Sequence, residues 1–480
     1  MGSFSTLEIG KRALLAQNLG IDIISNNVAN INTPGYSRRL PVTSQTQSNN
    51  TMNGYIGTGS MMDKLRNFRD ELFDKEIRNN VSRGSGYSVD ESILKQVEGV
   101  FSEPGDNNIG TQMTDFFNSF ETLSSNPQDT SLRNDVLDKA KTLVDTFHKT
   151  SQSLTDLRNN VLTDIKSNVT NANDIISQIA GLNSQISGSK SQTGDDSISL
   201  IDQREVLLEK LSDLADVNVT KADSGMVNVF MNGINVVTGQ NKNTLQVVEK
   251  VNSTTGEKSA QIYTSDSSGN AQYTISPQSG QLASELKHYN VTLDNLDSSG
   301  GYSVFKNLDS IANSLANKVN TIAITGYGLN DTGSTSPARS FFDPAVGAAT
   351  AANIQIGSDI VDKPENIPMS DAPNEPGNGN IGLKIADLAT DDNFVGGQTA
   401  AAFYAGITGK IGTMENEATN GQNTTKLLSD QLTNQRESVI GVNLDEEAVN
   451  LIKFQKAFEA SSRIINTTSE MLTAIINLGK

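Results

Sequence analysis

Apolar residues recur at every seventh position at both ends of the chain. A seven-residue repeat keeps one side of an α-helix facing a partner, as in a coiled coil. The pattern therefore predicts an N-terminal helix and a C-terminal helix that pair with each other. We call the repeating residues the assembly stripe; they are Leu7, Leu14, Ile21, Val28, Leu444, Leu451, Phe458, Ile465 and Leu472.

Both terminal segments also carry apolar residues outside the stripe, such as Leu15, Leu19, Ile452 and Ile464. A single pair of helices would leave these side chains in water. Ordering about 60 terminal residues costs roughly 60–120 kcal/mol of backbone entropy, whereas each stripe residue returns about 1.5–3 kcal/mol when buried. We therefore expect the termini to be mobile in an isolated chain and to order in a multi-subunit assembly. The alternative is that they pack on the chain's own body as an ordinary helical core.

Between the two ends the pattern changes from helix to strand and back to helix. Helical spacing covers residues 61–101, 113–123, 129–187 and 199–211, and a helix over 129–187 would be roughly 90 Å long. Such a long helix needs partners, and the candidates are 61–101 and 400–440. Alternating apolar residues then predict strands over 217–219, 227–236, 245–251, 260–264 and 272–275, with Asn232-Gly233 as a hairpin turn.

The last part of the body predicts helices within 280–324 and 400–439, separated by loops and short strands over 325–376. The fold class is therefore mainly α with an inserted β domain, and the molecule is elongated. Residues 1–45 and 440–480 would form a terminal coiled-coil domain. The helical stem would comprise 46–215, 280–325 and 377–439, and the β-rich outer domain 216–279 and 326–376.

Composition excludes several kinds of partner. The net charge is −18 and the basic residues form no cluster beyond Arg38-Arg39, so nucleic acid and anionic membrane surfaces are poor partners. No apolar stretch is long enough to insert in a membrane. The N-terminus lacks the basic start and apolar run of a cleaved secretory signal, so an extracellular protein would need another route of export.

Candidate catalytic and metal-binding residues are scarce. The chain has no cysteine and two histidines, His148 and His288, which stand without a second ligand at metal-binding spacing. The run Asp445-Glu446-Glu447 lies where a helix starts, and a capping and dipole role is the simpler interpretation. We therefore expect no enzymatic activity, no cofactor and no metal.

A specific motif follows the first helix, Ser25-Asn-Asn-Val-Ala-Asn-Ile-Asn-Thr-Pro-Gly-Tyr-Ser-Arg-Arg39. Asparagines and Pro34-Gly35 predict a helix end and a bend. The motif resembles the signature of the bacterial flagellar axial proteins, and its Tyr-Ser-Arg continuation is most similar to the hook-associated proteins of the hook–filament junction. The matching residues are Asn26, Asn27, Ala29, Asn30, Asn32, Thr33, Pro34, Gly35 and Tyr36.

Two further segments resemble the same family. One contains Asp202-Gln-Arg204 within 199–219, and the other begins Gly441-Val-Asn-Leu-Asp-Glu-Glu447 and extends to residue 476. One departure is Phe458, where relatives often have tyrosine. The three motifs cover under a quarter of the chain, but their joint occurrence in this order is specific.

The resemblance implies a secreted structural protein of the extracellular flagellum, exported by the flagellar type III apparatus. It would form a homo-oligomeric ring between the hook protein and the next hook-associated junction protein, and an export chaperone would hold its C-terminal helix. The terminal helices would line the tube, the long helices would surround them, and the β domain would lie outside. A hook or distal rod protein is the alternative within the family. A non-flagellar extracellular adhesin or scaffold is the alternative outside it.

Overall fold

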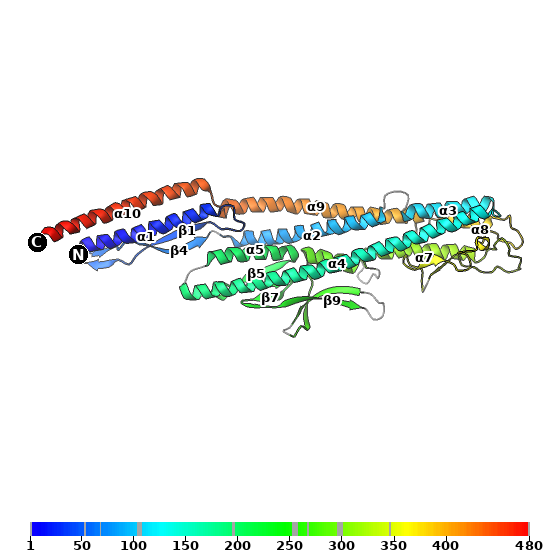
Figure 1. Ribbon diagram of the computed structural model, residues 1–480, viewed down its shortest axis with the longest axis horizontal. Helices are drawn as coiled ribbons and strands as arrows, with labels where there is room; N and C mark the ends of the chain where they lie inside the picture. Colours follow the sequence, from blue (N-terminus) through cyan, green and yellow to red (C-terminus); the bar gives the residue numbers. More distant parts are fainter. Residues whose placement is uncertain are drawn as a thin grey trace.

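The computed structural model describes residues 2–51, 54–67, 69–102, 108–193, 197–251, 258–265, 268–294, 301–344 and 347–478. The molecule is elongated and mostly helical, with both chain ends at one extremity (Figure 1). This confirms a mainly α fold with small sheets. The α-helices are α1 (Gly2–Ala29), α2 (Glu71–Phe101), α3 (Ile109–Ser125), α4 (Thr130–Thr193), α5 (Ile198–Leu214), α6 (Gln281–Lys287), α7 (Val304–Ala323), α8 (Asn380–Ala386), α9 (Ala400–Ile440) and α10 (Leu444–Leu478).

The strands form small antiparallel sheets. The order of the larger two is β5-β6-β7-β8 and β11-β10-β9, and the pairs are β1 with β4, β2 with β3, and β12 with β13. The predicted Asn232-Gly233 turn joins β6 to β7, and both of its residues have positive φ. The strands are β1 (Arg39–Gln45), β2 (Asn49–Thr51), β3 (Gly54–Ile56), β4 (Ser60–Asn67), β5 (Val217–Lys221), β6 (Val227–Met231), β7 (Ile234–Thr238), β8 (Asn241–Lys242), β9 (Thr244–Val251), β10 (Lys258–Ser265), β11 (Ala271–Ile275), β12 (Phe342–Pro344) and β13 (Ile354–Ile356).

Helix α4 runs along most of the body and confirms the predicted long helix, with 64 residues and a length of about 96 Å. The buried side of α4 changes along its length. Phe147, Leu154 and Val161 are buried, but further on Ile165 and Ile179 are buried while the seven-residue series continues at half-buried positions. A straight helix rotates by about 20° per heptad relative to a strict seven-residue repeat. The contact surface of α4 therefore shifts from one series of residues to the next.

The expected pairing of 400–440 with the long helix is wrong. Helix α9 packs along α2, and α4 packs on α3 and α5 (Figure 1). The α2–α9 contact is close because Gly421 lies against the ring of Tyr87, where an added Cβ would come within 2.6 Å. Glycine at this position allows the two helices to approach each other.

The expected helix start at residue 61 is also wrong, because residues 60–67 form β4. This strand pairs with β1 from Arg39↔Asn67 to Gln45↔Ser60, and the resulting hairpin packs on α1. Gly84-Ser85-Gly86, despite its two glycines, lies inside an unbroken α2. The spacing of a few apolar residues between 61 and 67 did not distinguish a strand from the first turns of a helix.

The end of the body opposite the termini, which we call the tip, has an aromatic core. Phe116 and Phe120 of α3 pack edge to face, and Phe116 also contacts Phe341 and Phe342. Nearby, the buried Arg133 guanidinium donates to the carbonyls of Pro127 and Ile367 and so fixes the loop before α8. The loops and short strands of 326–376 lie at this tip, whereas β5 to β11 lie beside α4 (Figure 1). The division into domains stays a prediction.

Candidate assembly site

Helices α1 and α10 lie side by side and antiparallel, beyond the end of the helical body (Figure 1). Ile465 of α10 lies against Gly10, Phe454 lies against Gly20, and Glu447 reaches Asn27. The β1–β4 hairpin packs on another side of α1. We call these elements together the terminal arm. The sequence therefore correctly predicted that the two termini meet.

The assembly stripe occupies different environments on the two helices. On α10, Leu451, Phe458, Ile465 and Leu472 are half-buried, while Leu444 is exposed. On α1, Leu7, Leu14 and Ile21 are half-buried and Val28 is exposed, while the most buried apolar side chains are Ala16, Ile23 and Ile24. The stripe residues of α1 are therefore less buried than Ala16, Ile23 and Ile24. Its role in assembly stays a prediction.

Large apolar side chains remain in water on both helices of the arm. Their exposed fractions are high for residues of this kind, for example 73% for Phe4 and 57% for Ile452. Exposed apolar groups gathered on one element indicate a contact surface. We call these residues the outer face of the arm; they are Phe4, Leu15, Leu19, Val449, Ile452, Ile464, Met471, Ile475 and Ile476.

Asn27, from the N-terminal motif, connects four parts of the arm. Its side chain is fully buried. Its Oδ1 accepts from the Tyr36 hydroxyl at 2.9 Å and from the Arg39 amide at 3.1 Å. Its Nδ2 donates to the Arg39 carbonyl at 2.9 Å and to Glu447 Oε2 at 3.2 Å. The amide therefore joins α1, the loop after it, the start of β1 and the start of α10.

Glu447 has a role that the sequence interpretation missed. Its carboxylate is 0% exposed, and Arg38 Nε donates to Oε1 at 2.7 Å. Arg38 also pairs with Glu446 on the surface. Asn443 caps α10, because its Oδ1 accepts from the Asp445 amide. The acidic run thus supplies a buried ion pair across the arm. The one sequence feature that could have indicated a basic partner for Glu447 was the pair Arg38-Arg39 in the N-terminal motif.

The loop after α1 is held in one conformation by local bonds. Asn30 Nδ2 donates to the Asn26 carbonyl, and Thr33 Oγ1 donates to Asn30 Oδ1. Gly35 has φ +76°, and an added Cβ would lie 2.4 Å from Val206 of α5. Two constraints therefore require glycine at position 35: the positive φ and the lack of space for a Cβ. The remaining motif residues, Ala29, Asn32 and Pro34, are exposed.

The structure brings the three sequence motifs together at one place. Ser37 Oγ donates to Asp202 Oδ1 at 2.7 Å, so the N-terminal motif touches the α5 motif, and through Asn27 and Glu447 it also touches the α10 motif. Burial raises the pKa of Asp202, while the bonds from Ser37 oppose that rise. Burial also raises the pKa of the Tyr36 hydroxyl, against the nearby charge of Arg39. Segments separated by hundreds of residues thus form a single joint.

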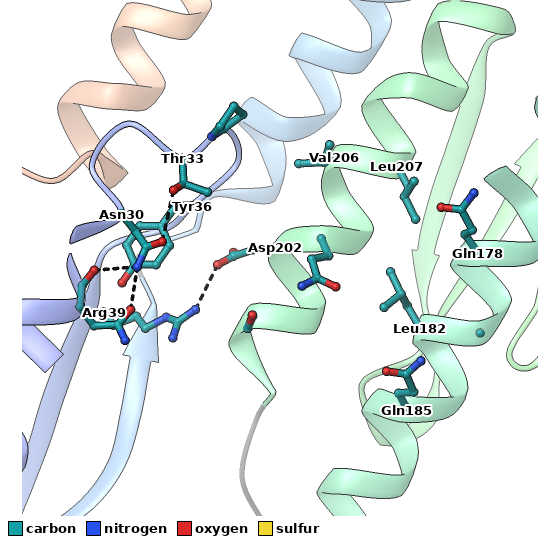
Figure 2. A pocket seen from close by; sticks show the side chains of 15 residues that line it. Asn30, Thr33, Tyr36, Arg39, Gln178, Leu182, Gln185, Asp202, Val206 and Leu207 are labelled. Carbon is teal, nitrogen blue, oxygen red and sulfur yellow. Dashed lines mark hydrogen bonds and ion pairs between the residues drawn. The ribbon is translucent and has the colours of Figure 1, made fainter. Parts of the chain in front are cut away.

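A groove of about 840 Å³ opens beside this joint. Figure 2 shows Asn30, Thr33, Tyr36 and Arg39 on the loop side, Gln178, Leu182 and Gln185 on α4, and Asp202, Val206 and Leu207 on α5. Amide and apolar side chains line it, and its two charged groups, Arg39 and Asp202, face each other at 3.8 Å. Such a lining suits contact with another protein surface better than catalysis.

The two histidines have structural partners. His148 bonds to the Ile354 carbonyl, and the buried His288 lies between Asp90 and Thr292. Among the described residues, no group of three or more His, Cys, Asp or Glu side chains could hold a metal ion. No helix in the part of the chain that the structure describes is long and apolar enough to cross a membrane.

Three protein families match parts of the chain. Residues 94–342 match the family described as flagellar hook-associated protein FlgK helical domain. Residues 7–36 match the flagella basal body rod protein family, and residues 437–478 match the C-terminal family of flagellar basal body rod FlgEFG proteins. The two terminal matches coincide with the arm, and the first match covers most of the helical body.

Individual relatives extend over almost the whole chain. Flagellar hook-associated protein 1 of Bacillus subtilis is 29% identical over 99% of this chain and 98% of its own length. The protein of the same name from Escherichia coli is 25% identical over 97% of this chain and 98% of its own length. The solved structure of the flagellar hook junction protein FlgK from Burkholderia pseudomallei superposes with a TM-score of 0.61 at 17% identity, over 76% of this chain and all of that one. This likeness supports the fold.

Proposed function

The chain belongs to the flagellar hook-associated protein FlgK family and is a structural subunit of the junction between flagellar hook and filament; we propose that it assembles there through its terminal arm. In this proposal α1 and α10 form a coiled coil whose outer face contacts the arms of neighbouring copies. The helices of the body form a bundle stem outside the arm, and the sheets beside α4 face outward.

The observation that carries this proposal is the distribution of side chains on α10. Within its described part, the buried side chains are Glu447, Ser461 and Thr468, which are polar, while Ile452, Met471 and Ile475 are exposed. A helix that folded for its own chain alone would show the opposite distribution, because burial of apolar surface drives folding. The exposed apolar residues are therefore available for contacts between subunits.

Partners and export follow from family membership. We propose a ring of copies that contacts the hook protein on one side and the next hook-associated junction protein on the other. Export would proceed through the flagellar type III apparatus, with a chaperone covering the outer face of α10 as a helix held in a groove. A hook or distal rod protein would share the terminal motifs. The match of residues 94–342 to the FlgK helical domain favours the junction protein instead.

The proposal is tested by electron microscopy of flagella from a strain that lacks this protein. We expect hooks without filaments, and restoration by the wild-type chain. Normal filaments in the deletion strain would contradict the junction role.

Two neighbouring residues of α10 separate pairing within the arm from contacts between subunits. Leu451 is half-buried, whereas Ile452 is 57% exposed. Leu451→Asp should weaken the α1–α10 pair and also block incorporation. Ile452→Asp should leave the free chain as stable as wild type but still block incorporation. If a strain with Ile452→Asp swims normally, the outer face does not take part in assembly. The control is Leu383→Asp, which changes an exposed leucine of the tip.

A further inference from the structure

A seven-residue repeat does not by itself fix how two helices align along their length. If α10 slides along α1 by seven residues, apolar residues of the assembly stripe again face apolar residues. Because the termini are expected to be mobile before assembly, the two helices must reach one alignment each time the arm orders. Some other feature of the arm therefore has to distinguish the observed alignment from the shifted ones.

Two glycines of α1 lie against large side chains of α10. Gly20 is buried, and a Cβ added to it would lie 2.5 Å from the ring of Phe454. Gly10 is also buried, and an added Cβ would lie 2.8 Å from Cγ1 of Ile465. Glycine is among the least favourable residues inside a helix. The space that these two glycines leave for α10 gives their presence a structural reason.

A polar contact marks the same alignment at the other end of the helix pair. Asn27 Nδ2 donates to Glu447 Oε2 at 3.2 Å. On α1, Asn27 stands seven residues after Gly20. On α10, Glu447 stands seven residues before Phe454. Because the helices are antiparallel, the polar contact and the glycine–ring contact repeat along one alignment.

A shift by one heptad removes the space for the large side chains. Phe454 would then lie opposite Ala13 or Asn27, and neither residue leaves the space that Gly20 provides. The same shift moves the isoleucine off the second glycine and separates the buried amide from its carboxylate. Closely packed interiors tolerate such added volume poorly. The shifted alignments are therefore disfavoured although the assembly stripe would match in each of them.

We propose that Gly10 and Gly20 are positioning residues that set the alignment of α10 on α1 when the arm orders. The seven-residue repeat brings the two helices together, and the glycines determine which residues lie opposite each other. Phe454 and Ile465 fit against them in one alignment only. This inference rests on the proposed assembly through the arm, and it names the residues on which a correctly aligned outer face depends.

Disulfide cross-linking in isolated flagella measures the alignment. The protein contains no cysteine, so introduced pairs supply all the thiols. Ala13→Cys and Ser461→Cys lie one heptad from the Gly20–Phe454 contact, so this pair reports the observed alignment. Ala13→Cys with Thr468→Cys reports an alignment shifted by one heptad. In the otherwise wild-type chain the first pair should form a disulfide within one chain, detected as linked peptides in the unreduced monomer band, and the second pair should stay reduced.

Gly20→Leu fills the space without weakening the helix, because leucine has the higher helix propensity. The variant should still reach the culture medium, but the strain should lose its filaments. Phe454→Ala in the same chain should restore the filaments and the Ala13→Cys/Ser461→Cys disulfide, because the smaller side chain makes room for the leucine. Phe458→Ala, one turn further along α10, should not restore them.

The matched control is the same substitution at a glycine of the body. Gly99 lies inside α2, and a Cβ added to it meets no atom within 4 Å. Gly99→Leu should leave the filaments normal. Normal filaments with Gly20→Leu, no rescue by Phe454→Ala, or equal rescue by Phe458→Ala would each overturn the inference. Wild-type flagella in which both cysteine pairs cross-link would also overturn it, whereas failure of the proposed function is read separately, from the filaments of the deletion strain.

Discussion

The tip buries its large apolar side chains, whereas the terminal arm leaves many of its own exposed. At the tip, Phe116, Phe120, Phe341 and Phe342 are all 0% exposed, and their rings pack against one another. In the arm, α10 buries polar residues and exposes isoleucines and a methionine. The tip carries the contacts that fold this chain, whereas the arm keeps much of its apolar surface for other molecules.

The difference also appears in the interactions that hold each region together. The tip relies on packing of large rings, which is strong and needs no partner. The arm relies on a buried amide, a buried carboxylate and an arginine at one end of a long helix pair. Directional bonds fix how the parts of the arm fit together, and they leave the outer face free for neighbouring subunits.

The largest expected loss of stability comes from a substitution in the aromatic core of the tip. Phe116→Ala removes a fully buried ring from the centre of the aromatic core and should lower the free energy of unfolding by about 3–5 kcal/mol. Phe4→Ala, the same change on the outer face of the arm, should alter it by about 0.5 kcal/mol or less. Chemical denaturation of the two variants measures the difference. Equal losses would show that the arm is packed as tightly as the tip.

A second change tests a polar site inside the body. Glu285 of α6 is buried, Asn168 donates to its Oε1 at 2.7 Å, and burial raises its pKa from 4.5 to about 8. The folded state keeps the proton over this range while the unfolded state releases it. Stability should therefore fall as pH rises from about 4.5 to about 8 and level off above that.

Glu285→Gln should remove most of this slope. The variant should match wild type near pH 4 and exceed its free energy of unfolding at pH 8, by an amount on the order of a few kcal/mol. Denaturation curves at several pH values measure it, with the exposed Glu121→Gln as control. A wild-type slope that persists in Glu285→Gln would assign the pH dependence to other groups.

The smallest effect on the whole chain is confined to the arm. Asn27→Ala leaves Glu447 Oε2 and the Arg39 backbone without their buried partner, while Arg38 still binds Oε1, and should cost about 1–3 kcal/mol. In the assembled junction, where the arm is expected to be ordered, hydrogen exchange should become faster in α1 and α10 and stay unchanged at the tip. Asn18→Ala, an exposed position on the same helix, is the control. Unchanged exchange in the arm would show that Asn27 does not hold it together.

The long helices could be predicted from the sequence because periodicity extends over many turns. α1, α4, α9 and α10 all lie where apolar spacing placed them, as do the strands around the Asn232-Gly233 turn. The packing partner of each helix was harder to predict from the sequence, because the contact surface of α4 rotates along its length and α9 lies on α2. Strand β4 was missed because its pairing with β1 is decided by contacts between distant residues, which a local pattern does not contain.

The motif residues were found by resemblance, and their roles came from the geometry. Nothing in the sequence indicated that Asn27 and Glu447 would share a hydrogen bond across 420 positions. Gly35 could be predicted to make a bend, but its close approach to Val206 could not. Conversely, the burial of Asp202 shows why a charged residue occurs in the middle of an apolar helix pattern: it faces the arm.

The antiparallel pairing of α1 with α10 places the start of α1 and the end of α10 at the same extremity of the molecule (Figure 1). Each helix supplies one half of a surface that neither can form alone. A prematurely terminated product, however well its tip folds, therefore presents an unfinished arm. In the proposed assembly, such a product would offer its neighbours only the α1 half of the contact surface.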